Sequence, residues 1–127
     1  MQKTFLKGGC HCGAVQFEFV PSKHVIECNC SICTMSGFVH CIVPQSDFVL
    51  LKGSNVLRSY RFNTETANHL FCEICGVKSY YYPRSHPDSV SINLRCVADG
   101  GLDQLDTIKF DGRNWEKEIH QLRSKSH

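Results

Sequence analysis

The sequence predicts a mainly β protein made of short antiparallel strands, with one short helix near its C-terminal end. Three observations lead to this prediction. Short runs rich in β-branched and aromatic residues recur along the 127-residue chain. Gly, Asn or Pro separates most of these runs, as is typical of turns between strands. Helical periodicity is found in one stretch only, close to the end of the chain.

The strands are placed from the alternation of apolar and polar residues. In residues 14–20 three large apolar side chains alternate with other residues until Pro21 ends the run. Residues 38–43 form a second candidate strand, which stops at Pro44. Further strands are expected at 48–52, 56–62, 67–71, 77–82, 89–94 and 107–110.

The helix is expected at residues 115–123. Asn114 is a suitable N-cap residue, and Trp115, Ile119 and Leu122 then share one face. A short terminal helix of this kind can cover an open edge or end of a sheet.

Length and composition indicate one globular domain that spans residues 1–127. Hydrophobic residues make up 42% and charged residues 20% of the chain, as in ordinary soluble domains. The net charge of +2 is too small to indicate a nucleic-acid or membrane partner. No apolar stretch approaches the ~20 residues of a membrane helix, and residues 1–9 lack the features of a secretory signal. We therefore expect an intracellular protein, cytoplasmic or nuclear and not secreted, of undetermined oligomeric state.

Cysteines carry the strongest functional signal in the chain. Seven of the nine fall into three groups: Cys10 and Cys12, then Cys28, Cys30 and Cys33, and finally Cys72 and Cys75. Structural zinc takes four protein ligands, whereas catalytic zinc takes three and keeps one position open. The seven thiols therefore divide into four and three, which predicts two zinc ions per chain. A disulfide scaffold is the alternative, but the odd total and the close spacing within each group argue against it.

The closed, structural site is assigned to two cysteine pairs that are each followed by glycine. Cys72 and Cys75 have the CxxC spacing of a zinc knuckle, and Cys10 and Cys12 directly precede the first convincing strand. A glycine after each pair can adopt the backbone angles that a tight turn needs. A metal shared by these four thiols would close a long loop, where a crosslink is entropically most favourable.

A rival assignment joins Cys30 and Cys33 to the late CxxC pair as a ribbon-type site. It would leave Cys10, Cys12 and Cys28 as the odd three, and spacing alone does not exclude it. The first assignment is preferred because it keeps the dense triplet together and uses both glycine-ended pairs.

The reactive site is assigned to Cys28, Cys30 and Cys33. Three thiolates within six residues can face one metal ion and leave its fourth corner free. Zinc with three thiolates has a net charge of about −1, so an incoming thiol can bind as a thiolate, its nucleophilic form. Alternatively, the protein itself fills the fourth corner, and the candidates are His40, His11, Cys41 and Cys96.

Four other residues have a predicted orientation or role. His40 and Cys41 are consecutive in a strand and should face opposite sides, so that one can approach the metal while the other packs inside. Cys41 and Cys96 are interpreted as buried free thiols. Arg84 could bind a substrate carboxylate, although a solvated loop arginine is the simpler interpretation.

The runs GGCHCGAV at 8–15, CNCSIC at 28–33 and FCEICG at 71–76 resemble the family of glutathione-dependent formaldehyde-activating enzymes. Within that family the similarity is greatest to the centromere protein V branch. Residues 82–85 and 111–116 extend the resemblance over nearly the whole chain. Three ordered cysteine groups are together a highly specific signal.

The resemblance implies a β-tent fold, which is an all-β zinc-binding architecture. It implies a structural zinc on the four paired cysteines and a catalytic zinc on the triplet, with water or glutathione at the open corner. The family's named reaction joins formaldehyde to glutathione, gives S-hydroxymethylglutathione and is classed as a carbon–sulfur lyase. We therefore expect a zinc-dependent carbon–sulfur lyase that acts on a small-molecule thiol and a small electrophile.

Two other functions are alternatives. A non-catalytic zinc module would bind protein or chromatin through its sheet, although the nearly neutral charge makes nucleic acid the weaker partner. A thiol–disulfide oxidoreductase would need alternating strands and helices around the CxxC motif, and the sequence lacks that pattern. The proton donor and the true electrophile are not indicated by the sequence.

Overall fold

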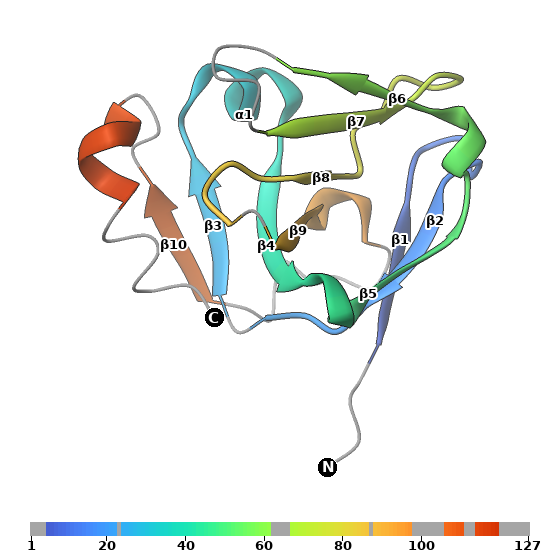
Figure 1. Cartoon of the computed structure of the whole chain (residues 1–127), viewed down its shortest axis with the longest axis horizontal. Helices are drawn as coiled ribbons and strands as arrows, with labels where there is room; N and C mark the ends of the chain where they lie inside the picture. Colours follow the sequence, from blue (N-terminus) through green and yellow to red (C-terminus); the bar gives the residue numbers. More distant parts are fainter. Residues whose placement is uncertain are drawn as a thin grey trace.

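The computed structural model describes residues 5–22, 24–61, 67–86, 88–97, 106–110 and 114–119. These residues form two β-sheets, so the predicted mainly β fold is confirmed (Figure 1). The smaller sheet has the order β1-β2-β5 and consists of β1 (Leu6–Gly9), β2 (Gln16–Phe19) and β5 (Phe48–Lys52).

The larger sheet has seven strands in the order β10-β3-β4-β9-β8-β7-β6. Its strands are β3 (His24–Cys28), β4 (Val39–Pro44), β6 (Leu57–Tyr60), β7 (Asn68–Cys72), β8 (Tyr80–Tyr82), β9 (Ser89–Asn93) and β10 (Asp106–Phe110). Every neighbouring pair is antiparallel except β10 and β3, which run parallel from Asp106 opposite His24 to Phe110 opposite Cys28. The expected antiparallel arrangement therefore has one exception at the sheet edge. Parallel strands need a long connection, and most of the chain lies between β3 and β10.

Helical structure is limited to short segments. Helix α1 (Ser31–Ser36) follows β3, and 3₁₀ turns occur at Gln45–Asp47, Ser54–Val56 and Leu94–Cys96. Residues 115–119 form the expected C-terminal helix, and the remainder of the predicted helix, including Leu122, lies outside the described residues. Within the described part of the chain no helix is long and apolar enough to cross a membrane.

The main core lies between the two sheets. The alternation predicted for residues 14–20 is confirmed, because Val15, Phe17 and Phe19 are fully buried. Phe17 packs edge-on against Tyr80 of β8 at a centroid distance of 5.5 Å, which joins the small sheet to one face of the large one. This core also contains Cys41 and Ile92, which lie opposite each other on β4 and β9.

The other face of the large sheet carries a second, smaller apolar cluster. Ile26 of β3 and Ile42 of β4 pack there with Ile119 of the C-terminal helix. Cys28 and Trp115 are partly buried against the same cluster. The helix therefore packs through Ile119 on β3 and β4, and it lies beside the edge strand β10 (Figure 1).

Strand β1 was not predicted, because its sequence, Leu-Lys-Gly-Gly, shows no apolar alternation. Position 9 of this strand has no room for a side chain. A Cβ atom there would lie 2.2 Å from the carbonyl oxygen of Val15, far inside contact distance. Glycine therefore lets β1 approach the start of β2 closely, and the tight turn between these strands carries Cys10 and Cys12.

Candidate metal centres

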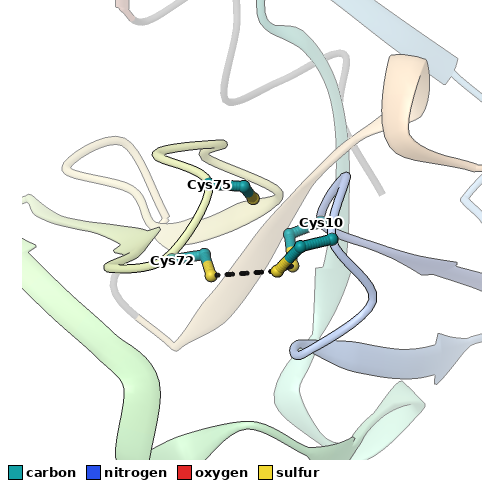
Figure 2. Close-up of side chains that lie close together, drawn as sticks. Cys10, Cys72 and Cys75 are labelled. Atoms are coloured by element: carbon teal, nitrogen blue, oxygen red, sulfur yellow. Dashed lines mark hydrogen bonds between the residues drawn. The ribbon is translucent and has the colours of Figure 1, made fainter.

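Four cysteine sulfurs from two distant turns meet in one place. Cys10 and Cys12 lie on the turn between β1 and β2, while Cys72 and Cys75 lie at the end of β7 and on the turn after it. Their sulfurs all lie within 4.8 Å of one another, and we call them the four-thiol cluster. Figure 2 shows Cys72 and Cys75 pointing toward Cys10 from the opposite turn.

The two turns of this cluster have the predicted glycine geometry. Gly13 and Gly76 adopt φ values of 82° and 77°, in the left-handed region that glycine enters without strain. The Gly76 amide donates a 2.8 Å hydrogen bond to the Cys72 carbonyl, and the Gly13 amide donates one of 3.2 Å to the Cys10 carbonyl. Each glycine therefore closes a tight turn that aims two sulfurs inward.

Backbone amides also point at the sulfurs. The Val15 amide lies 3.3 Å from Cys10 Sγ, and the Ile74 amide lies 3.4 Å from Cys72 Sγ. Burial opposes ionisation of Cys10, but the Val15 amide and the neighbouring Cys12 outweigh it, so the pKa of Cys10 is lowered. The turns are thus arranged to accommodate thiolates.

The spacing of the sulfurs fits a shared metal ion. Cys10 Sγ lies 3.6 Å from Cys12 Sγ, which lies 3.7 Å from Cys72 Sγ. Tetrahedral zinc with bonds of about 2.3 Å separates its sulfurs by about 3.8 Å, whereas a disulfide bond is about 2.05 Å long. All nine cysteines are free thiols.

The second group of sulfurs belongs to Cys28, Cys30 and Cys33, which we call the thiol triplet. Their sulfurs also lie within 4.8 Å of one another. Cys28 ends β3, Cys30 is the N-cap residue of α1, and Cys33 lies inside that helix. Cys33 is buried, whereas Cys28 and Cys30 are half-buried, so one side of the triplet faces outward.

Helix α1 sets the geometry of the triplet. The Thr34 amide donates a 2.9 Å hydrogen bond to the Cys30 carbonyl, which closes the first helical turn. This turn folds Cys33 back toward Cys30. The helix ends at Gly37, whose φ of 66° is typical of a left-handed C-cap.

The three thiols affect one another's ionisation. Contacts with the Cys28 and Cys33 thiols lower the pKa of Cys30 to about 2, while the Cys30 contact raises the pKa of Cys28 to about 11. The Cys28 and Cys30 neighbours also raise the pKa of Cys33. The ionisation of each thiol therefore depends on the other two, and a divalent cation would displace protons from the triplet.

His40 of β4 is the side chain that supports the triplet. Its Nε2 atom lies 3.0 Å from Cys33 Sγ, and its Nδ1 atom lies 2.9 Å from Ser91 Oγ and 3.3 Å from the Tyr81 hydroxyl. Cys41 points the opposite way into the main core, so the predicted opposite orientation of these two neighbours is confirmed.

The His40 ring is neutral near pH 7, because burial lowers its pKa to about 3. Burial also raises the pKa of Tyr81 well above its usual value, so its hydroxyl stays protonated. The neutral ring therefore links Cys33 Sγ at Nε2 to Ser91 and Tyr81 at Nδ1, and such outer contacts orient metal ligands.

The four side chains considered for a fourth ligand lie outside both groups of ligand atoms. Among the described residues, the set around the triplet contains the three sulfurs and excludes His40, His11, Cys41 and Cys96. The ribbon-type rival is also not what the structure forms, since Cys30 and Cys33 are grouped with Cys28.

Arg84 is held in place and does not extend freely into solvent. Its guanidinium stacks on the Trp115 ring, 3.4 Å from the ring centroid, and one nitrogen lies 2.6 Å from Glu116 Oε1. Trp115 in turn packs on the cluster beside Cys28. The simpler sequence interpretation of a solvated loop arginine is therefore wrong.

The polar and aromatic groups near the triplet were not predicted from the sequence. These are Phe38, His69, Lys78 and Tyr81, which contact one another and His40. No spacing rule identifies them, because they meet only after β4, β7 and β8 have paired in the sheet.

Comparisons with known proteins agree with the geometry. The model of the glutathione-dependent formaldehyde-activating enzyme family matches residues 5–118. A crystal structure of a Rhodobacter sphaeroides protein, a structural-genomics target, is similar with a TM-score of 0.68 and 30% sequence identity. That similarity covers 81% of this chain and 100% of the other. The chain therefore belongs to the family of glutathione-dependent formaldehyde-activating enzymes.

Proposed function

We propose that this protein is a zinc-dependent carbon–sulfur lyase that joins glutathione to formaldehyde, or to a similar small carbonyl compound, at the thiol triplet. The observation that supports this most directly is the grouping of three sulfurs within 4.8 Å, two of them on half-buried residues. Family membership supports glutathione and formaldehyde as the substrate pair. Nine free thiols suit the reducing interior of a cell, where glutathione is maintained.

The two groups of thiols would hold two zinc ions with different tasks. Cys10, Cys12, Cys72 and Cys75 would hold a structural ion, whereas Cys28, Cys30 and Cys33 would hold the catalytic one. Soft thiolate ligands suit zinc among the common divalent metals. When bound to the triplet, zinc would supply the charge that deprotonates an incoming thiol and holds it as a nucleophile.

The reaction itself needs no oxidant or reductant. The glutathione sulfur loses its proton and forms a C–S bond to the carbonyl carbon, and the carbonyl oxygen receives a proton to become a hydroxyl. The chain's own residues would position this step. The His40 ring would orient the Cys33 sulfur, and the rings of Phe38 and Tyr81 beside His40 would limit the access of water.

Metal analysis combined with glutathione titration tests this function. We expect two zinc ions per purified chain, and a cobalt-substituted protein whose visible spectrum changes when glutathione is added. S-methylglutathione has no thiol and should leave the spectrum unchanged. Exchange NMR should also show faster formation of S-hydroxymethylglutathione than in buffer alone. A spectrum unaffected by saturating glutathione would contradict the proposal and favour a non-catalytic zinc module.

A further inference from the structure

The amine of Lys78 lies among aromatic rings that connect it to the thiol triplet. Its Nζ atom is 4.1 Å from the ring centroid of Tyr81 and 4.8 Å from that of Phe38. The Phe38 ring lies 4.6 Å from the ring of His40, which contacts Cys33. One continuous set of contacts therefore leads from the lysine to the sulfurs.

The ammonium group of Lys78 makes one hydrogen bond to a side chain of the protein. Lys78 Nζ lies 2.6 Å from His69 Nδ1, and the His69 ring stacks on Tyr81 at 4.7 Å. Burial and the lysine charge lower the pKa of His69 to about 4, so its neutral ring accepts the bond. An ammonium group has three N–H donors, and His69 is the one hydrogen-bond partner of Lys78 Nζ among the residues that the structure describes, which leaves two donors for a ligand.

The thiols of the triplet, and no carboxylate among the described residues, favour the charged form of Lys78. Among the described residues no carboxylate oxygen lies within 4.0 Å of its Nζ atom. Burial lowers the pKa of Lys78 to about 8, while the Cys33 and Cys30 thiols oppose this shift. A partly buried cation is costly without a negative partner, so this amine is suited to receive negative charge that forms beside the triplet.

The backbone around Lys78 is anchored on both sides. The Lys78 carbonyl accepts a 3.2 Å hydrogen bond from Asn93 Nδ2, and the Ser79 carbonyl accepts one of 2.9 Å from the Asn93 amide. On the other side, the Val77 carbonyl accepts a 3.1 Å hydrogen bond from the Cys72 amide. The four-thiol cluster and β9 thus hold the lysine in a fixed position, as a preorganised donor requires.

We propose that Lys78 is the catalytic residue that binds and protonates the carbonyl oxygen of the electrophile, an inference that rests on the proposed function of the triplet. As the thiolate sulfur forms the C–S bond, the electron pair of the C=O π bond moves to oxygen. The Lys78 ammonium donates one proton to that oxygen, and the neutral amine takes a proton from solvent to replace it. In the reverse reaction the amine removes the hydroxyl proton and the thiolate leaves.

Substitutions of Lys78 test this role when binding and rate are measured separately. Lys78→Met keeps an apolar stem among the rings, and Lys78→Arg keeps the charge but stays protonated at any accessible pH. Lys52→Gln, at an exposed position on β5, is the matched control. The dissociation constant for glutathione is read from the cobalt spectrum, and kcat is read from exchange NMR.

We expect Lys78→Met to bind glutathione within about twofold of wild type while its kcat falls about 100-fold, as for loss of one preorganised donor. Lys78→Arg should lose at least about tenfold in kcat, because it cannot cycle a proton. If Lys78→Met binds fewer than two metal ions and is therefore misfolded, the kcat of Lys78→Arg is the measurement that decides. Lys52→Gln should match wild type in both measurements.

Three results would overturn the inference. Glutathione binding weakened about tenfold with unchanged kcat would make Lys78 a site for a substrate carboxylate. Wild-type values for both measurements would make it a structural residue. A wild-type protein that neither responds to glutathione nor accelerates the reaction would overturn the proposed function as well, whereas the first two results leave that function intact.

Discussion

The four-thiol cluster and the thiol triplet use the same ligand atom, but their cysteines come from different parts of the fold. The first joins the β1–β2 turn of the small sheet to the β7–β8 turn of the large one, and Cys12 and Cys72 are 60 positions apart. The second comes from residues 28–33 alone. A metal in the first would crosslink the two sheets, whereas a metal in the second would crosslink only one short segment. A metal at the first position would mainly stabilise the fold, whereas a metal at the second would be free to take part in the proposed chemistry.

The polar groups around the sulfurs also differ between the two clusters. Backbone amides, which do not titrate, point at Cys10 and Cys72 in the four-thiol cluster. The triplet also has backbone amides at Cys28 and Cys30, but it adds an ionisable side chain, His40 at Cys33, with Tyr81 and Lys78 behind it. Amide donors stabilise a thiolate without taking part in proton transfer, whereas ionisable side chains can move protons.

Removing a ligand from the four-thiol cluster should have the largest effect. Cys72→Ser replaces a fully buried ligand that joins the two sheets, so we expect a loss of more than about 3 kcal/mol, or about 10 °C in Tm. Thermal unfolding followed by circular dichroism measures this. Cys96→Ser, a half-buried cysteine outside both clusters, should cost much less. A Cys72→Ser protein with wild-type Tm would remove the distinction between the two clusters.

Removing a ligand from the triplet should abolish activity but retain the fold. We expect Cys30→Ser to bind one zinc ion in place of two and to react no faster than buffer, with Tm lowered by less than about 5 °C. Metal analysis, melting and exchange NMR on one preparation measure these three quantities. Met35→Ala, at an exposed position on α1, is the control. Unfolding of Cys30→Ser to the extent of Cys72→Ser would show that both sites are structural.

A smaller and more selective effect is expected from His40→Gln. The substitution removes the imidazole ring that contacts Cys33, so metal affinity at the triplet should fall about 10- to 100-fold while the four-thiol cluster keeps its ion. Competition with a chromogenic chelator resolves the two ions. His11→Gln, an exposed histidine between Cys10 and Cys12, should change neither affinity. Equal weakening of both sites would mean that His40 acts only through the packing of the sheet.

Local sequence signals predicted the parts of the fold that depend on neighbouring residues. The alternation of Val15, Phe17 and Phe19 reflects one buried strand face, and the structure buries all three. Glycine after each cysteine pair predicted the two turns at Gly13 and Gly76. Ligand counting, rather than periodicity, placed Cys10 and Cys12 with the late CxxC pair, and their sulfurs lie together in the structure.

Other features depend on long-range contacts or on segments too short to show a period. Helix α1 has six residues, fewer than two turns, so no helical pattern can be recognised in it. Strand β1 exists because two glycines permit a close approach, which apolar alternation does not report. Residues 77–79 were predicted as the start of a strand, but they have no strand structure. Asn93 anchors this segment through hydrogen bonds to the Lys78 and Ser79 carbonyls. The position of Lys78 follows from that anchoring.

The parallel pairing of β10 with β3 affects the order in which the nascent protein matures. Synthesis delivers β4 to one edge of β3 soon after Cys28 emerges, but the opposite edge stays unpaired until residues 106–110 have left the ribosome. The seven-strand order of the large sheet is therefore complete only after residues 106–110 have been synthesised.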